Sequence, residues 1–493
     1  MKYFLPLLFA CLFISNATTQ AQNFANQSVL RQGNWIKVGT TQRGIYKMDY
    51  NFLKNAGMDI DNINPQNIQL YGNVGGMLPQ ANDAVRIDDL RENAIWVAGQ
   101  EDGKFDVGDY ILFYAQGAIS WSYDATQKHF KHTQNVYSDS VYTFVTVGTT
   151  AGKRVQPQNS VGGASQILGI FDDYQVYEKD ERVVLAQGSG REWYGELFDF
   201  DTEKSFAFDT PGLVNGTPIS ITSFVMGRSA LDTRFSVSVN GVALGQQSIA
   251  AQPQGTYDIK GRDQITDFTI NSQQVSSNQQ LNIALNYDKN NGNSVGYLNY
   301  LCLNYQRTLQ LYGQQTTFRA IASLDQPVTN FSIGNVSNGT TIWDLTDPFT
   351  PAAQQYQLNG NQAVFGANTT TLKEFVAFQG TDFPLPESVT PISNQNLHAL
   401  APTNLVIVTP EAFASQAERL ADFRRTHDGL TVSVVNVQQI YNEFASGKQD
   451  ITAIRDFGRM LYLRSPQTFR YLLLFVFCSY DFKYRVAIYT NFV

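Results

Sequence analysis

One thiol and one imidazole near the end of the chain could form a nucleophile and its base. Cys478 follows an apolar run at 471–475 that predicts a buried strand, and α/β enzymes commonly place reactive side chains where such a strand ends. A thiol nucleophile requires a base that stabilises the thiolate and carries its proton. The candidate base is His427, which is the only histidine in residues 400–493.

We predict that these two side chains cannot meet. His427 falls at the C-terminal end of a helix predicted over 411–425, which is the sheet edge where the next parallel strand begins. Cys478 instead falls where a strand ends, and a five-residue strand separates the two edges by roughly 17 Å at about 3.3 Å per residue. We therefore interpret Cys478 as structural and predict no complete catalytic centre in this sequence.

A second group of potential ligands lies in the acidic segment 101–109, where four carboxylates surround two glycines. Asp102, Asp106 and Asp109 are the candidates for a calcium site, because Ca²⁺ prefers six to eight oxygen ligands. The spacing departs from the EF-hand pattern, since Lys104 occupies a ligand position and no glutamate closes the loop. The pattern favours an acidic turn between strands over a calcium site.

No other segment carries a convincing metal or cofactor signature. His129 and His132 are three residues apart, but a third zinc ligand is missing nearby. The chain has no P-loop, and the glycines at 72–76 lack the strand-to-helix context of a dinucleotide-binding loop. We therefore predict no cofactor.

The elements that would position these residues belong to two kinds of structure. Residues 400–493 alternate continuous apolar runs with helical periodicity, which predicts right-handed crossovers and a parallel α/β sheet. The predicted strands are 405–408, 430–435 and 471–475, and the predicted helices are 411–425 and 450–464. Because a doubly wound sheet usually contains more strands, we predict that this α/β domain is incomplete.

The preceding sequence predicts two mainly β domains. In residues 22–163, short apolar runs are separated by Gly, Asn and Asp, and the runs at 35–38 and 44–48 predict a hairpin. Residues 164–390 alternate apolar and polar side chains between Asn-Gly turns, which favours an antiparallel β-sandwich with one wet face. Three prolines between 384 and 391 mark the linker to the α/β domain.

Residues 1–21 have the pattern of a secretory signal peptide. Lys2 provides a positive start, the apolar run at 3–14 is too short to cross a bilayer, and Ala21 ends a cleavage-like site. We expect an exported protein that begins near Gln22. The net charge of −8, without any long basic run, argues against nucleic-acid binding. Three cysteines in 493 residues do not form a disulfide framework.

Short segments in the β regions and in the α/β region resemble one family, the gingipain-type cysteine peptidases. None of these segments is specific alone, and the resemblance rests on their order and joint occurrence. They are 33–35, 44–47, 50–53, 71–73, 101–103, 105–106, 108–110, 190–196, 343–344, 416–420, 449–456 and 479–481.

The resemblance implies a caspase-like peptidase domain and the activity of a type IX secretion sortase. Such an enzyme removes C-terminal sorting domains from secreted cargo and attaches the cargo to lipopolysaccharide. Its implied partners are cargo proteins and outer-membrane secretion components, and its implied location is the periplasm, outer membrane and cell surface. The family's catalytic His and Cys lie on strands later than the third, so we assign neither role here and expect this chain to be inactive alone.

One local departure from the family follows the third predicted strand. The family usually has Gly-Asp at this place, where this chain has Val476 and Phe477. A truncation, a damaged gene or a sequencing error would each explain the difference, and the sequence leaves all three open.

The alternative interpretation is an exported, non-enzymatic β-sandwich module that binds glycan or a secretion partner. Trp121, Tyr123, Trp193 and Tyr194 could stack on sugar rings in such a module. However, the chain contains 25 Tyr and 33 Phe, so we interpret these four side chains as packing residues.

Overall fold

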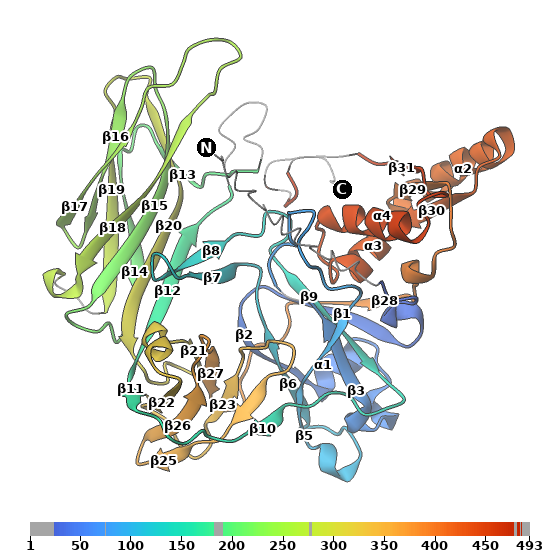
Figure 1. The fold of residues 1–493 in the computed structure, drawn as a ribbon, viewed down its shortest axis with the longest axis horizontal. Helices are drawn as coiled ribbons and strands as arrows, with labels where there is room; N and C mark the ends of the chain where they lie inside the picture. The colour runs from blue at the N-terminus through green and yellow to red at the C-terminus, as the bar shows by residue number, and fades with distance from the viewer. Residues whose placement is uncertain are drawn as a thin grey trace, which may run out of the picture.

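The computed structural model describes residues 24–73, 75–181, 191–275, 279–477, 481–483 and 485. Figure 1 shows three groups of β-strands and an α/β region at the C-terminal end of the chain. The predicted signal peptide at 1–21 and Cys478 lie outside the described residues. No helix in the described part is long and apolar enough to span a bilayer.

The N-terminal module consists of two sheets that enclose a core of Ile, Val, Met and Phe side chains. One sheet has the order β28-β1-β9-β3-β4 and the other the order β2-β6-β5. The elements are β1 (Trp35–Thr40), β2 (Gly44–Asp49), α1 (Tyr50–Asn55), β3 (Ile68–Gly72), β4 (Arg91–Asn93), β5 (Trp96–Ala98), β6 (Tyr110–Ala115), β9 (Val141–Val147) and β28 (Ser388–Ile392). A separate hairpin, β7 (Ser120–Asp124) with β8 (His129–Thr133), extends from this module.

The predicted hairpin between 35–38 and 44–48 is wrong. β1 pairs with β9 and β28, whereas β2 pairs with β6 in the other sheet. Both strands are buried along nearly their whole length, without the alternating wet face of an exposed hairpin. The short link at 41–43 therefore crosses from one sheet to the other.

Residues 170–308 form a β-sandwich with a core of its own. Alternate side chains of its strands are buried, and Leu281, Ile283, Leu285 and Tyr287 are at most 1% exposed. The strands are β12 (Ile170–Glu178), β13 (Glu196–Phe198), β14 (Glu203–Asp209), β15 (Pro218–Arg228), β16 (Thr233–Val239), β17 (Val242–Ile249), β18 (Arg262–Asn271), β19 (Gln280–Asp288) and β20 (Val295–Thr308).

The turn between β16 and β17 confirms one sequence signal for this sandwich. Asn240 and Gly241 have φ of 46° and 80°. These left-handed values are those of the tight turn that joins two antiparallel strands, and they explain the Asn-Gly pair.

A third module lies at the lower end of the sandwich in Figure 1 and has a separate, Phe-rich core. Its two sheets have the orders β10-β24-β23-β27-β21 and β11-β22-β26-β25. The strands are β10 (Gln156–Gln158), β11 (Gln166–Leu168), β21 (Gln315–Phe318), β22 (Val328–Ile333), β23 (Thr341–Asp344), β24 (Ala352–Gln354), β25 (Gln357–Asn359), β26 (Gln362–Asn368) and β27 (Phe375–Phe378). The sequence 164–390 thus contributes to two packed pairs of sheets, and its last strand, β28, completes the N-terminal module.

The C-terminal region is a parallel α/β unit, as the sequence predicts. Its sheet has the order β30-β29-β31, and both strand pairs are parallel. The elements are β29 (Leu405–Thr409), α2 (Ala414–Asp428), β30 (Val432–Asn436), α3 (Val437–Phe444), α4 (Thr452–Arg464) and β31 (Tyr471–Leu474). α3 is the one helix here that the sequence analysis does not predict.

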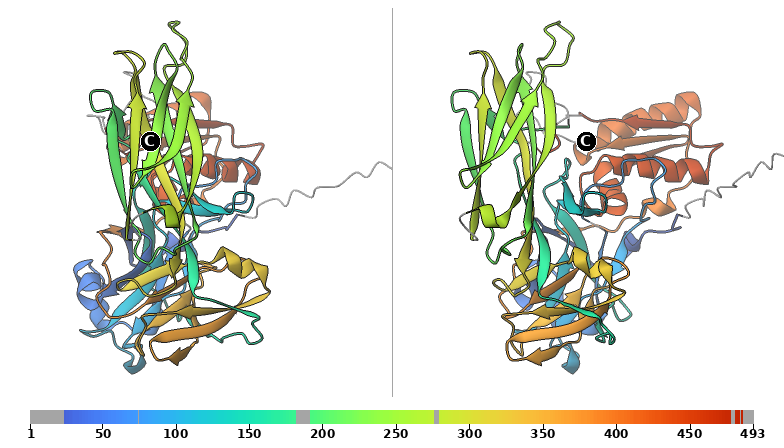
Figure 2. Two further views of the ribbon diagram at one scale, coloured as in Figure 1. Left: turned by 90° about the vertical axis from the view of Figure 1, so that its left-hand side faces the viewer. Right: turned by 60° about the vertical axis from the view of Figure 1, so that its left-hand side comes forward.

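The α/β region packs against the N-terminal module rather than against the third module, and the views in Figure 2 agree on this placement. The amide of Leu78 donates to Asp450 Oδ2 at 2.7 Å. Arg86 Nε lies 3.0 Å from Asp456 Oδ2, and both side chains are largely buried. The junction is therefore held by polar contacts that link segments more than 350 residues apart.

Candidate functional site

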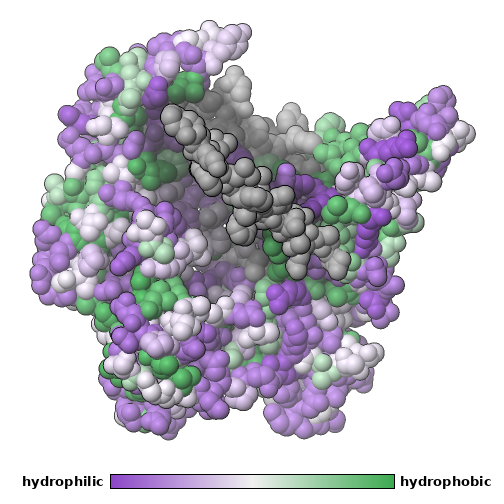
Figure 3. Space-filling view, in the orientation of Figure 1, coloured by the Kyte–Doolittle hydropathy of each residue, from purple (hydrophilic) through white to green (hydrophobic). Residues whose placement is uncertain are grey.

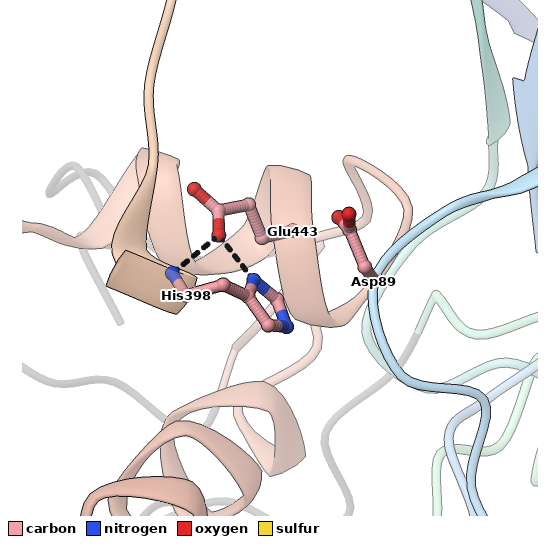
Figure 4. Close-up of side chains that lie close together, drawn as sticks. All are labelled: Asp89, His398 and Glu443. Carbon is pink, nitrogen blue, oxygen red and sulfur yellow. Dashed lines mark hydrogen bonds and ion pairs between the residues drawn. The ribbon is translucent and has the colours of Figure 1, made fainter. Parts of the chain in front are cut away.

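A buried histidine lies at the point where the N-terminal module meets the α/β region. His398 belongs to a single 3-10 turn, Leu397–Ala399, that follows β28. Glu443 lies in the last turn of α3, and Asp88 and Asp89 lie in the loop before β4. Figure 4 shows His398 and Glu443 facing each other, with Asp89 on the adjacent loop of the N-terminal module.

Both ring nitrogens of His398 contact carboxylates. Nδ1 lies 2.5 Å from Glu443 Oε2, and Nε2 lies 3.0 Å from Asp88 Oδ1. The ring also stacks on Phe444 at 4.7 Å between centroids. Because each nitrogen faces an oxygen that can only accept, both nitrogens donate when the carboxylates are ionised, and the ring is the imidazolium.

Glu443 is fully buried, and its carboxylate accepts hydrogen bonds from other groups besides the histidine ring. Its Oε1 accepts from the amide of Leu397 at 2.8 Å and from the side chain of Gln395 at 2.9 Å, and its Oε2 accepts from the amide of His398 at 3.2 Å. A buried carboxylate with this many donors is held in one orientation. The contacts fix the segment after β28 on the surface of α3.

The electrostatics of the cluster favour the charged histidine. Burial alone would lower the pKa of His398, but its hydrogen bonds to Asp88 and Glu443 and the nearby charge of Asp89 outweigh burial and raise that pKa to about 9. Burial raises the pKa of Asp89 to about 6, although His398 and the donors Ser28 and Val29 oppose this change.

Asp89, His398 and Glu443 place three potential metal-ligand atoms within 4.8 Å of one another. A metal ion requires a neutral imidazole nitrogen with a free lone pair. In this cluster both nitrogens of His398 are engaged by carboxylates, and the raised pKa keeps the ring protonated. The residues therefore fit an ion-paired structural junction and do not fit a metal centre.

The carboxyl edge of the parallel sheet is the place where open α/β folds commonly bind ligands. There Thr409 Oγ1 donates to the carbonyl of Phe475 at 3.0 Å, and Asn436 Nδ2 donates to Glu411 Oε2 at 2.9 Å. Phe413 packs edge-on against Phe475. The described residues of this edge include no thiol and no imidazole.

The structure describes the predicted base, His427, but not the predicted nucleophile, Cys478. His427 lies in the last turn of α2, as predicted, and its side chain is 68% exposed beside Asp428. It stacks on Phe423 and lies at the sheet edge opposite the carboxyl edge, because the C-terminal end of α2 leads into the start of β30. Cys478 lies outside the described residues, so its distance from His427 stays a prediction.

The three calcium candidates make local turn contacts. Asp102 accepts from the amide of Lys104 at 3.0 Å, and Asp109 accepts from the amide of Asp106 at 2.7 Å. Among the residues that the structure describes, the one group of three potential ligands is the His398 cluster, so Asp102, Asp106 and Asp109 do not converge.

The other histidines and Cys302 are structural in the described fold. His129 and His132 occupy β8, where an odd separation directs side chains to opposite faces. His132 Nε2 lies 2.6 Å from Glu178 Oε2. Cys302 is buried in the sandwich, and burial raises the pKa of its thiol to about 12.

Sequence reasoning does not find the His398 cluster, because its members lie far apart in the chain. His398 falls in the predicted linker, and Glu443 lies in the helix that the sequence analysis does not predict. One local signal was available: Asn436 is a helix-capping residue type before the apolar positions Val437, Ile440 and Phe444.

Residues 398–493, which include the C-terminal α/β region, match the family model of Peptidase family C25. The whole fold is similar to that of PorU. The crystal structure of dimeric latent PorU from Porphyromonas gingivalis matches with a TM-score of 0.81 and 23% sequence identity. The match covers 95% of this chain and 44% of that chain. This chain thus spans less than half the length of PorU, and its predicted resemblance to gingipain-type peptidases is confirmed.

Two carbohydrate-binding modules match only a small part of the chain. A family 36 module in complex with calcium and xylotriose covers 27% of this chain and 98% of its own, with 11% identity and a TM-score of 0.17. A family 35 module from Clostridium thermocellum covers 27% and 95%, with 12% identity and a TM-score of 0.18. Likenesses this weak carry no functional argument. No curated protein matches the chain by sequence.

Proposed function

We propose that this chain is the N-terminal part of a gingipain-type cysteine peptidase that acts as a sortase on secreted proteins. The observation that carries the proposal is one continuous PorU-like fold that includes the C25 region. In this role the complete enzyme removes C-terminal sorting domains from cargo and attaches the cargo to lipopolysaccharide. Its partners are the cargo and outer-membrane secretion components, and it is exported to the cell surface.

The contribution of this chain is to hold the peptidase region in a fixed position on the β modules. The His398 cluster and the Arg86–Asp456 ion pair join the same two bodies at separate points. Catalytic groups must be held within about 0.5 Å of their productive geometry, and buried polar contacts provide such rigidity. The junction therefore supports catalysis by fixing the position of the peptidase region.

We assign neither catalytic role to a described residue. His427 lies at the sheet edge opposite the one where ligands bind in such folds. Cys302 is buried in the sandwich, and its raised pKa keeps the thiol protonated.

The first test is the nucleotide sequence that follows codon 493. An open frame that encodes a His-Gly motif and then a Cys supports the peptidase proposal. The protein encoded by the whole frame should then cleave a cargo protein at its C-terminal sorting domain, as measured by mass spectrometry. The cleavage should stop after alkylation of thiols, because the proposed nucleophile is a cysteine.

The rival is an exported β-sandwich module that binds glycan or a secretion partner without any reaction. A stop codon directly after Val493, together with intact cargo after incubation, would favour this rival. Cargo cleavage that is insensitive to thiol alkylation would contradict the proposed cysteine chemistry as well.

A further inference from the structure

A cavity of about 210 Å³ lies where the N-terminal module, the sandwich and the third module meet. A water molecule occupies about 30 Å³ in the liquid, so the cavity has room for a small chemical group. The residues that matter for its chemistry are Arg43, Trp121, Phe130, Tyr174, Arg319 and Glu374.

Arg319 is the most buried charged residue that lines this cavity. Its side chain is 2% exposed, and within the described part of the chain no atom accepts a hydrogen bond from Nε, Nη1 or Nη2. The nearest carboxylate oxygen, Glu374 Oε1, is 3.7 Å from Nη2. Buried charged donors without acceptors are costly, so such a group points to a ligand that supplies them.

Aromatic rings determine where an acceptor can reach Arg319. The guanidinium carbon lies 4.3 Å from the ring centre of Tyr174 and 5.4 Å from that of Phe130. Rings that stack on a guanidinium face leave its in-plane N–H groups available. An acceptor must therefore approach in the plane of the guanidinium, from the cavity.

Two guanidinium groups and one carboxylate line the cavity. Arg43 Nη1 lies 3.2 Å from the same Oε1 of Glu374 that faces Arg319, so one carboxylate serves two guanidinium groups. Burial raises the pKa of Tyr174, so this phenol is neutral and does not provide a second negative charge. Asp172 lies outside the cavity lining and adds a negative charge that acts on Arg319, but neither it nor Glu374 accepts a hydrogen bond from the Arg319 guanidinium.

We propose that this cavity binds a carboxylate group, with the buried Arg319 as its main partner and Arg43 nearer to solvent. The guanidinium fork matches a carboxylate in a planar, bidentate arrangement. A carboxylate adds a single negative charge beside Glu374 and Asp172, whereas a phosphate dianion would add a second one and be repelled more strongly. Arg43 and Glu374 are 25% and 31% exposed, so the entrance lies on their side.

The carboxylate can belong to a free small acid or to the C-terminus of a peptide. Isothermal titration of the full chain with acetate, with inorganic phosphate and with a short peptide in free-acid and amidated forms tests both sources. We expect saturable acetate binding that is tighter than phosphate binding. Binding of the free-acid peptide but not of its amide identifies a peptide terminus, and acetate binding without peptide binding identifies a small acid.

The Arg319→Gln variant tests the assignment of the site, and we expect it to bind acetate about tenfold more weakly or worse. Arg307→Gln is the matched control, because Arg307 is paired with Asp173 at 2.5 Å and lies outside the cavity. If Arg319→Gln does not fold, the acetate, phosphate and peptide titrations of the unaltered protein still show whether the protein binds a carboxylate. Absence of saturable acetate binding, tighter binding of phosphate, or equal acetate affinity in a folded Arg319→Gln would overturn the proposal.

Discussion

Nδ1 of His398 lies 2.5 Å from Oε2 of Glu443, a residue 45 positions later in the chain, and both side chains are buried. Asp88, which belongs to the N-terminal module, contacts the other ring nitrogen. The segment after β28, α3 and the loop before β4 therefore meet at one imidazolium ring. These contacts hold the α/β region against the N-terminal module.

Replacement of His398 by Gln should destabilise the junction by about 3 to 5 kcal/mol, because it leaves the buried carboxylate of Glu443 without its cation. Since the protein has several modules, hydrogen–deuterium exchange of the β29 and β30 amides is the appropriate measurement. We expect faster exchange in these strands and little change in the sandwich strand β19.

The matched control is His427→Gln, which removes an exposed histidine from the same region. Its effect should stay within about 0.5 kcal/mol, because His427 is exposed and exposed ion pairs and ring contacts contribute little. Equal exchange rates in His398→Gln and His427→Gln would contradict the role of the buried pair.

The junction should weaken as the pH rises toward 9. The pKa of His398 is about 9 in the folded protein and about 6.5 in an unfolded chain, so the folded state binds more protons between these values. The stabilisation is complete below about pH 6.5, and it is lost as the pH rises through 9. The total loss is roughly 3 kcal/mol, and β29 exchange protection at several pH values measures it.

The half-buried Lys37 and the buried Lys448 titrate in part of the same range, and their effect on stability has the opposite sign. Burial lowers the pKa of Lys37 and of Lys448 to about 8. The folded state therefore binds fewer protons than the unfolded state above that pH, and these groups add stability as the pH rises. Because both lysines are present in His398→Gln, the difference between the two proteins isolates the histidine. An unchanged difference from pH 6.5 to 9 would contradict the assignment.

The α/β region could be predicted from the sequence because its signals are local. The continuous apolar run at 405–408 is long enough for a doubly buried strand, and β29 occupies Leu405–Thr409 with every residue buried. The helix predicted over 450–464 matches α4 at Thr452–Arg464. Helix and strand periodicity within ten to fifteen residues decides such elements.

The β modules and the His398 cluster depend on contacts that no local pattern contains. β1 pairs with β28, which lies some 350 residues later in the sequence, rather than with its neighbour β2. Asp88, which contacts His398, likewise lies 310 residues away in the sequence. Alternation shows which face of a strand is buried but does not identify its partner. The hairpin prediction failed for that reason, and the cluster was not found.

Calcium should leave the melting temperature unchanged, because the acidic segment 101–109 is a turn held by its own hydrogen bonds. Asp109→Ala should cost about 1 kcal/mol, since it removes the acceptor of the Asp106 amide. Thermal melts with added Ca²⁺ and with a chelator measure both effects. A rise of the melting temperature with Ca²⁺ that disappears in Asp109→Ala would show that the segment is a calcium site instead.

A charged side chain on β31, at the edge of the parallel sheet, should be tolerated. β31 pairs only with β29 in the described structure, and its four side chains are exposed. Apolar residues also gather over parts of the α/β region in the space-filling view of Figure 3. An exposed apolar edge strand is a site for aggregation, so Leu472→Lys should delay aggregation during refolding, as followed by light scattering.

The comparison with β29 makes this prediction specific. Leu472 is 41% exposed, and its partner in register, Val406, is fully buried. Leu472→Lys should change the free energy of unfolding by less than about 1 kcal/mol, because its charge stays in water. Val406→Lys should prevent folding of the region, because an unpaired buried charge has no compensating contact. If Leu472→Lys is as damaging as Val406→Lys, the face of β31 is covered in the folded protein and is not a free edge.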